Sequence, residues 1–228
     1  MSVNGMRISD LSRRSGLPVP TIKFYLRAGL VAAGTRTAHN QARYDEEHLR
    51  RLRLIAILST VGRLGLSAVR DILAAVDDPD LSLVRLHEIV GEVLFAGRPV
   101  PLDERPLSRA GAAIDRSLAG RGWWVDRRSA GHATLSGALA AVQQFAGEAD
   151  VAILAPYLDA VEALGHQEAA ALAKQDAEAD RATVVVRIVM FDVILDALRF
   201  VAQEHYLREL TVLRDPRPSA RPGRSSPG

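Results

Sequence analysis

Apolar residues recur at helical spacing along most of the chain. In the segment 44–62, Asp45 can cap the first turn of a helix. At about 100° per residue, the following apolar residues form one stripe on that helix: Leu49, Leu52, Ile55, Ala56 and Leu58. Alternation of apolar and polar residues, which is typical of strands, is absent from the C-terminal two-thirds. The pattern predicts a mainly α-helical protein.

Two short helices are predicted near the start of the chain. The stretch "RISDLSRRSG" offers Ser9 as a cap and ends at Gly16. After the connection "GLPV", Pro20 suits the first turn of a second helix and Gly29 suits its end. Two short helices joined by a tight turn predict a helix-turn-helix.

The two faces of the second helix differ in chemistry. One face carries Ile22, Tyr25 and Leu26, and the opposite face carries Pro20, Lys23, Phe24 and Arg27. Lysine and arginine can reach guanine edges or phosphates in a major groove, and a ring edge can pack on sugars or thymine methyl groups. The second face therefore suits DNA. Packing of Phe24 under a neighbouring loop is the alternative interpretation.

A small basic hairpin is predicted between this helix-turn-helix and the next helices. The segment 31–49 has no helical or strand period of useful length, but it contains Gly34, Asn40 and flanking arginines. The segment "LSAVRDILAAVDD", with Ser67 as its cap, predicts a further helix. The predicted order is helix, turn, helix, basic hairpin, helix, helix.

Charge is distributed unevenly along the chain. Residues 1–70 contain twelve Lys or Arg and four Asp or Glu, a net charge of +8. The remaining residues contain 17 Lys or Arg and 23 Asp or Glu, a net charge of −6. A basic N-terminal third is typical of a nucleic-acid-binding domain attached to a second part, although a solvated basic surface would give the same count.

Three sequence motifs lie in the N-terminal third: "RISDLSRRSGLPVPTIKFYLRAGL", "ARYDEEHLRRLRLI" and "LGLSAVRDIL". In their order and spacing, they resemble the mercury-resistance regulator (MerR) family of transcription factors over residues 6–78. The resemblance implies a winged helix-turn-helix whose second helix enters the major groove and whose small β wing follows the DNA backbone. The family's Arg-Tyr-Tyr word corresponds to Lys23-Phe24-Tyr25, so the first aromatic lacks a hydroxyl for phosphate.

The expected DNA contacts combine this resemblance with the faces of the second helix. In the wing, the family commonly shows a Gly-Tyr-Arg word where this chain has "NQARY", which leaves Arg36 and Arg43 as the wing cations. The full set of expected contacts is Arg14, Pro20, Thr21, Lys23, Phe24, Tyr25, Arg27, Arg36, Asn40 and Arg43.

The resemblance also implies a function and partners. Such proteins bind an inverted repeat in double-stranded promoter DNA as homodimers, distort it when a small effector binds, and so realign the elements read by RNA polymerase. A ligand-independent repressor or architectural DNA-binding protein is the alternative. A protein-interaction module would leave the basic N-terminal third unexplained. No phosphate-binding glycine loop, zincin word or nucleophile elbow is present, so an enzyme is not expected.

The remaining two-thirds depart from the family pattern of one long dimerisation helix. The helix predicted in "SLVRLHEIVGEVLFAG" is broken by "GRPVPLDERP". We predict a DNA-binding domain over 1–78, a short dimerisation helix and linker over 79–105, an all-helical effector and dimerisation domain over 106–214, and a disordered tail over 215–228. The segment from Val184 to Leu198 is apolar nearly all round, which requires burial in a bundle or a subunit interface.

Large rings and a methionine in this C-terminal part suggest an effector pocket, with core packing as the alternative. The candidates are Trp123, Trp124, Phe145, Tyr157, Met190, Phe191 and Tyr206. The chain has no cysteine, and His132, His166 and His205 lack metal-ligand spacing, so we expect no metal or other cofactor. No signal-like segment or uncharged apolar span is present, which predicts a cytoplasmic protein without a membrane partner.

Overall fold

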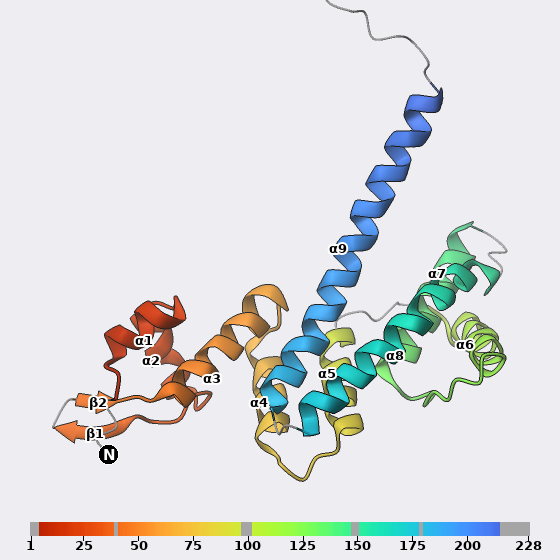
Figure 1. The fold of residues 1–228 in the computed structure, drawn as a ribbon. Helices are drawn as coiled ribbons and strands as arrows, with labels where there is room; N and C mark the ends of the chain where they lie inside the picture. The colour runs from red at the N-terminus through yellow and green to blue at the C-terminus, as the bar shows by residue number, and fades with distance from the viewer. Residues whose placement is uncertain (1–4, 39–40, 97–101, 147–150, 178–179, 215–228) are drawn as a thin grey trace, which may run out of the picture. The chain divides into compact units, whose positions relative to one another are not determined.

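The structure is a computed structural model that describes residues 5–38, 41–96, 102–146, 151–177 and 180–214 (Figure 1). The chain divides into two compact units, Met1–Met190 and Phe191–Gly228. Asn40 and the predicted tail lie outside the described residues. The mainly α-helical class with a small two-stranded sheet is confirmed.

The N-terminal helix-turn-helix consists of α1 (Ile8–Ser15) and α2 (Val19–Arg27). Gly16 ends α1 in the left-handed region, with φ 74°, as a residue without a side chain can do at no steric cost. The expected cap at Ser9 is wrong, because α1 begins at Ile8 and its N-cap is Arg7, two residues earlier. Asp10 accepts a hydrogen bond from the backbone N–H of Arg7 (3.1 Å) and so satisfies the first turn instead.

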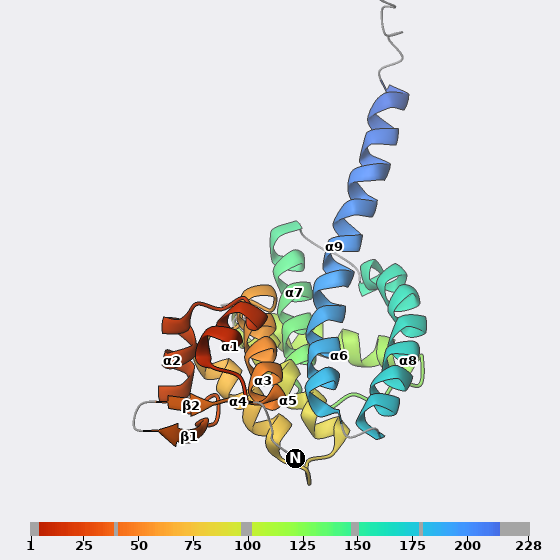
Figure 2. The ribbon, with the colours of Figure 1, turned by 60° about the vertical axis from the view of Figure 1, so that its left-hand side comes forward.

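The predicted hairpin is confirmed as β1 (Thr35–Ala38) and β2 (Gln41–Arg43), which pair antiparallel with Arg36 opposite Ala42. A bridge between Met6 and Tyr44 attaches the base of this hairpin to the start of α1. Figures 1 and 2 both show the hairpin beside α1 and α2. The hairpin is called the wing below.

Two further helices support the helix-turn-helix. They are α3 (Glu46–Ala56), which continues into the π-helical turn η1 (Ile57–Val61), and α4 (Leu66–Asp77). Asp45 caps α3 as predicted. Ser67 does not cap α4, because the helix starts at Leu66 and its N-cap is Gly65, a residue type that is also favourable there. The fully buried core of this region includes Leu11, Ile22, Leu49, Leu52, Ile55, Leu58 and Ile72.

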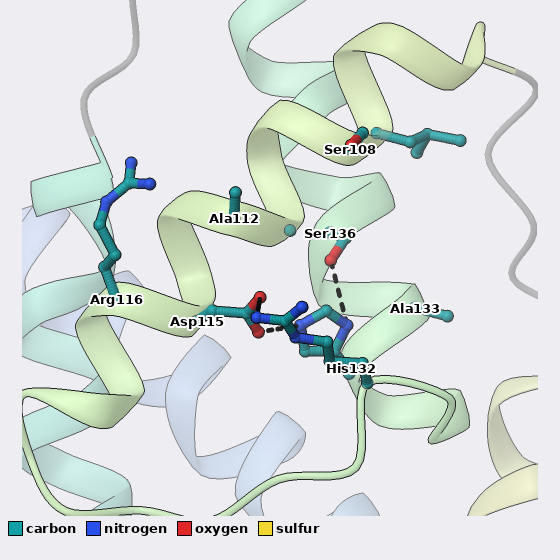
Figure 3. Close-up of a pocket in the computed structure, with 10 residues that line it drawn as sticks. Ser108, Ala112, Asp115, Arg116, His132, Ala133 and Ser136 are labelled. Atoms are coloured by element: carbon teal, nitrogen blue, oxygen red, sulfur yellow. Dashed lines mark hydrogen bonds and ion pairs between the residues drawn. The ribbon is translucent and has the colours of Figure 1, made fainter.

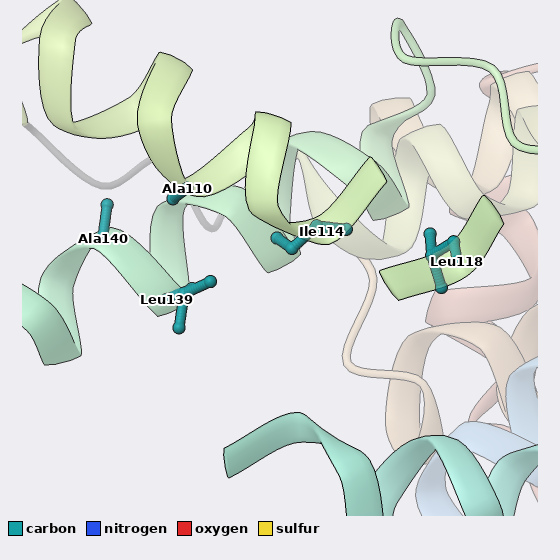
Figure 4. Packing of buried hydrophobic residues seen from close by; sticks show 5 residues of the cluster. All are labelled: Ala110, Ile114, Leu118, Leu139 and Ala140. Atoms are coloured by element: carbon teal, nitrogen blue, oxygen red, sulfur yellow. The ribbon is translucent and has the colours of Figure 1, made fainter. Parts of the chain in front are cut away.

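The regular elements among the described residues of the C-terminal part are all helical. Its elements are α5 (Leu83–Phe95), α6 (Glu104–Ala119), α7 (Ala130–Ala146), the 3-10 turn η2 (Val151–Leu154), α8 (Ala155–Ala177) and α9 (Arg181–Arg214). Helices α6 and α7 pack through a small apolar cluster (Figure 4), which consists of Ala110, Ile114, Leu118, Leu139 and Ala140. Small residues on both helices allow this close approach.

The last helix differs between its two halves. In the first unit, its side chains Val184, Val185, Ile188 and Val189 are buried. Asp180 caps this end, because it accepts hydrogen bonds from the backbone and hydroxyl of Thr183 (3.2 and 2.7 Å) and pairs with Arg50 of α3. In the second unit, large apolar side chains of α9 are exposed. No helix in the described part of the chain combines the length and apolar character needed to cross a membrane.

Candidate nucleic-acid interface

Helix α2 presents the two faces that its sequence predicts. Ile22 is fully buried, whereas Pro20, Lys23 and Arg27 are exposed. Phe24 is 42% exposed, so its ring is not packed beneath a loop. Thr21, Tyr25 and Leu26 are half-buried at the margin between the faces. The residues predicted on the outward face are therefore exposed, whereas of the predicted inward residues Ile22 is buried and Tyr25 and Leu26 are half-buried.

The turn between α1 and α2 is fixed by local hydrogen bonds. The hydroxyl of Ser12 donates to the carbonyl oxygen of Leu17 at 2.7 Å, and the backbone N–H of Leu17 donates to Ser15 Oγ at 3.3 Å. Leu11 of α1 and Ile22 of α2 are both fully buried. These contacts hold α2 in one orientation, so its outward face is presented as a rigid surface.

Arg14, one of the expected contact residues, is engaged within the protein. Its Nη1 and Nη2 atoms donate to the two carboxylate oxygens of Glu46 at 2.5 and 2.9 Å. This bidentate pair links α1 to the first turn of α3. Arg14 therefore carries a locally compensated charge, whereas no carboxylate in the described part of the chain pairs with Lys23 or Arg27 of α2.

The two wing cations have different surroundings. Arg36 is exposed on β1. Arg43 is half-buried, and its Nη1 donates to the backbone carbonyl oxygen of Gly5 at 2.9 Å. Arg43 thus fastens the wing to the residues before α1, and Arg36 is the wing cation directed to solvent.

Comparison with known proteins matches this N-terminal arrangement. The sequence model of the MerR HTH family regulatory proteins matches residues 6–76. The HTH-type transcriptional regulator ZntR homolog of Haemophilus influenzae is 42% identical over 50 residues, which cover 22% of this chain and 37% of that protein. The crystal structure of SCO5550 from Streptomyces coelicolor A3(2), a candidate transcriptional regulator, is 31% identical with a TM-score of 0.64, and the match covers 88% of this chain and 95% of that chain. The chain belongs to the MerR family.

The MerR family is one of regulatory proteins with a DNA-binding helix-turn-helix, not of enzymes. The likeness to SCO5550 extends over most of this MerR-family protein, including its helical C-terminal part. The likeness to the ZntR homolog is confined to a stretch that spans about a third of that regulator.

The cap of α3 gives a pH-dependent prediction, because α3 supports both α2 and the wing. Hydrogen bonds from the side chain and backbone N–H of His48 hold the pKa of Asp45 below its usual value. Because the pKa of Asp45 is lower in the folded than in the unfolded protein, its carboxylate stabilises the fold at pH values above the unfolded-state pKa. This contribution to stability is lost as the pH falls through the folded-state pKa. We expect Asp45→Ala to lower the free energy of unfolding by about 1 kcal/mol at pH 7.

This difference should begin to shrink below about pH 4, where the carboxyl of the unfolded chain becomes protonated, and it should be lost as the pH falls through the lower folded-state pKa. The difference in free energy of unfolding is measured by urea unfolding of the wild type and of Asp45→Ala at pH 7 and at pH 3, with circular dichroism as the signal. Glu47→Ala, also in the first turn, is the control and should change stability less. An equal loss at both pH values would contradict the assigned role of the carboxylate.

The candidate ligand residues of the C-terminal part do not gather at one site. Trp123 and Tyr157 line the same cavity. Trp124 and Phe145 are 86% and 96% exposed and do not line it. Met190 is half-buried on α9, and Phe191 and Tyr206 belong to the second unit. Most residues that line this cavity are aliphatic and were missed, because their spacing is that of ordinary helix packing.

A separate polar pocket lies between α6 and α7 (Figure 3). There His132 Nε2 lies 3.0 Å from Asp115 Oδ1, and its Nδ1 lies 3.5 Å from the hydroxyl oxygen of Ser136. The second carboxylate oxygen of Asp115 pairs with Arg127 Nη2 at 2.9 Å. The imidazole is therefore held at both nitrogens in a fixed orientation.

This Asp115, His132 and Ser136 arrangement does not have the features of a hydrolytic centre. Ser136 is only 6% exposed and lies within the helix α7, whose backbone N–H groups are used by helical hydrogen bonds. Stabilisation of an oxyanion requires free donors directed at the reacting atom. The arrangement instead serves to position His132, whose ring also borders the apolar cavity of Trp123.

Proposed function

We propose that this protein binds an inverted repeat in double-stranded promoter DNA as a homodimer and regulates transcription by RNA polymerase. The observation that carries the proposal is the outward face of α2, where Lys23, Phe24 and Arg27 are exposed, together with an exposed cation of the wing, Arg36. A rigid helix with cations beside an aromatic ring suits a major groove, and a nearby strand cation suits the phosphate backbone.

The roles of the individual residues follow from their surroundings. Lys23 and Arg27 would reach base edges or phosphates, Phe24 would pack on sugars or thymine methyl groups, and Pro20, Thr21 and Tyr25 would approach the backbone. Arg36 would meet phosphate. Arg14 and Arg43, which are engaged with Glu46 and Gly5, would mainly hold the DNA-binding surface in shape.

We further propose that a small apolar molecule, bound in the helical C-terminal part, alters the affinity for DNA or the shape of the bound DNA. Sequence-dependent deformation makes control through DNA shape physically reasonable. A regulator of this kind acts in the cytoplasm, and it would need no metal or other cofactor.

Selection of bound fragments from random double-stranded DNA, with the full-length protein, tests the proposal. We expect enrichment of one inverted repeat, and footprinting should show protection of both half-sites. Binding that is equally strong on scrambled DNA at all salt concentrations would contradict specific regulation. Specific binding that no apolar compound changes would favour the ligand-independent repressor instead.

A further inference from the structure

An apolar cavity of about 400 Å³ opens between the end of α6, the loop after it, α7 and α8. Its size lies within the range of ligand sites for small molecules. The lining residues are Leu118, Trp123, Val125, Ser129, Gly131, His132, Leu135, Leu154, Tyr157, Leu158 and Val161. Four chain segments contribute walls, so the cavity is a concave site rather than one exposed helix face.

The turn after α6 places Trp123 in this wall. Gly122 adopts the left-handed region, with φ 74°, and its N–H donates to the carbonyl oxygen of Ala119 at 3.0 Å. The N–H of Trp123 then donates to the carbonyl oxygen of Leu118 at 3.1 Å. The chain thus folds back over the end of α6, and Trp123 packs against the apolar cluster of α6 and α7, whereas the next residue, Trp124, remains exposed.

The same turn is fastened to α8 across the cavity. Arg121 pairs with Asp159 and donates to Glu162 Oε2 at 2.9 Å. Hydrogen bonds with these two carboxylates raise the pKa of Arg121 above its usual value. The wall that carries Trp123 and the wall that carries Tyr157 are therefore connected by charged groups outside the cavity lining.

The charges near the cavity are already paired. None of the lining residues is an Asp, Glu, Lys or Arg. The ring nitrogens of the lining His132 already lie 3.0 Å from Asp115 and 3.5 Å from the hydroxyl of Ser136. Asp115 is also paired with Arg127. A charged group placed in this cavity would lose its hydration without gaining a free partner, which is costly. The rings of Trp123 and Tyr157, in contrast, offer favourable stacking for another ring.

We infer that this cavity binds an uncharged, mainly apolar molecule that contains an aromatic ring, with Trp123 as its principal contact. The inference rests on the proposed ligand response, for which it specifies the site and the chemical class. It also separates Trp123 and Tyr157 from the exposed rings Trp124 and Phe145, which take no part in the site.

The chain offers a matched test, because its two tryptophans are adjacent and only one lines the cavity. The probes are N-phenyl-1-naphthylamine, which is neutral, and 8-anilino-1-naphthalenesulfonate, which has the same rings with a sulfonate. We expect the full-length protein to bind one neutral probe per chain, and to bind the sulfonate at least tenfold more weakly. Tetraphenylphosphonium, an apolar cation, should not compete for the neutral probe.

Substitutions then locate the site. Trp123→Ala should weaken binding of the neutral probe at least tenfold, and Trp124→Ala should change it less than twofold. Val161→Phe fills the cavity without removing a packing residue, and it should also weaken binding at least tenfold while the circular dichroism spectrum is unchanged. In Trp124→Phe, where Trp123 is the remaining tryptophan, the probe should protect the indole from acrylamide quenching.

Unchanged affinity in Val161→Phe, or sulfonate binding as tight as that of the neutral probe, would overturn the inference. Operator binding is measured separately with ligand-free protein. If the protein binds the neutral probe at Trp123 but shows no specific DNA binding, the site is supported and the proposed regulation is contradicted. Specific DNA binding without any saturable probe binding overturns the site and leaves DNA recognition standing.

Discussion

We expect the single change Leu198→Asp to convert the full-length protein from a dimer into a monomer, and to weaken operator binding at least a hundredfold. Leu198 is 61% exposed in the second half of α9. Its exposed apolar neighbours Ile194, Leu195 and Val201 lie within about 120° of arc on the helix, at the spacing typical of a helix–helix interface. We propose that this stripe pairs with the same stripe of a second copy.

The reason for the large effect is symmetry. In a two-fold interface each substitution occurs twice, so Leu198→Asp would bury two unpaired carboxylates against apolar surface. Two recognition helices must be held about 34 Å apart, or a multiple of this, to read both half-sites together. Without the pairing each half-site binds alone, and the gain from linked binding, about a hundredfold or more, is lost.

Helix α9 fits this role better than α5. The part of α9 from Phe191 to Arg214 is about 36 Å long at 1.5 Å per residue, whereas α5 is about 20 Å long. The apolar residues Leu86 and Val90 of α5 are fully buried already in the single chain. The sequence predicts that both segments contribute to the dimer, and burial of these two α5 residues leaves α9 as the main candidate.

Phe200→Asp provides the matched control. Phe200 is 64% exposed, nearly the same as Leu198, but it lies about 160° away around the helix. We expect this variant to sediment as a dimer and to bind the operator within a few-fold of the wild type. Sedimentation velocity of both variants at micromolar concentration decides the matter. Dimers in both cases would show that the stripe is not the interface.

The sequence predicts the N-terminal fold well because the decisive signals there are local. Each signal affects only the backbone within a few residues of it. Ile22 marks the apolar face of a short helix, Gly16 allows α1 to end, and the carboxylate of Asp45 caps α3. Errors of two residues at the caps of α1 and α4 arise because several neighbouring residues compete for the same backbone groups.

The features of the candidate sites that the sequence does not predict depend on contacts between residues far apart in the chain. The carboxylate of Glu46, 32 positions away, engages Arg14, and the carbonyl of Gly5, 38 positions away, engages Arg43. Neither pairing has a local signal. The sequence likewise does not distinguish Trp123 from Trp124, because their difference in exposure depends on the chain folding back over α6 at Gly122.

The engagement of Arg43 also changes how the wing is best tested. The sequence alone predicts both Arg36 and Arg43 as wing cations that contact DNA. On that basis, DNA binding by Lys23→Ala would be compared with DNA binding by Arg43→Ala. Because Arg43 bonds to Gly5, its replacement would loosen the attachment of the wing and affect binding through the fold. Arg36, which is exposed on β1, is the cleaner wing variant, and Arg43→Ala should instead lower the free energy of unfolding.

We therefore expect Lys23→Ala and Arg36→Ala to weaken DNA binding in different ways. Loss of a base contact by Lys23 should cost about 1–3 kcal/mol on the selected site and relax specificity at one position. Loss of a phosphate contact by Arg36 should weaken binding to all sequences alike and reduce the slope of log affinity against log salt by about one. Isotherms on matched and scrambled sites at several salt concentrations separate the two effects. If Lys23→Ala changed only the salt slope, α2 would contact the backbone alone, and specificity would have to arise from DNA shape.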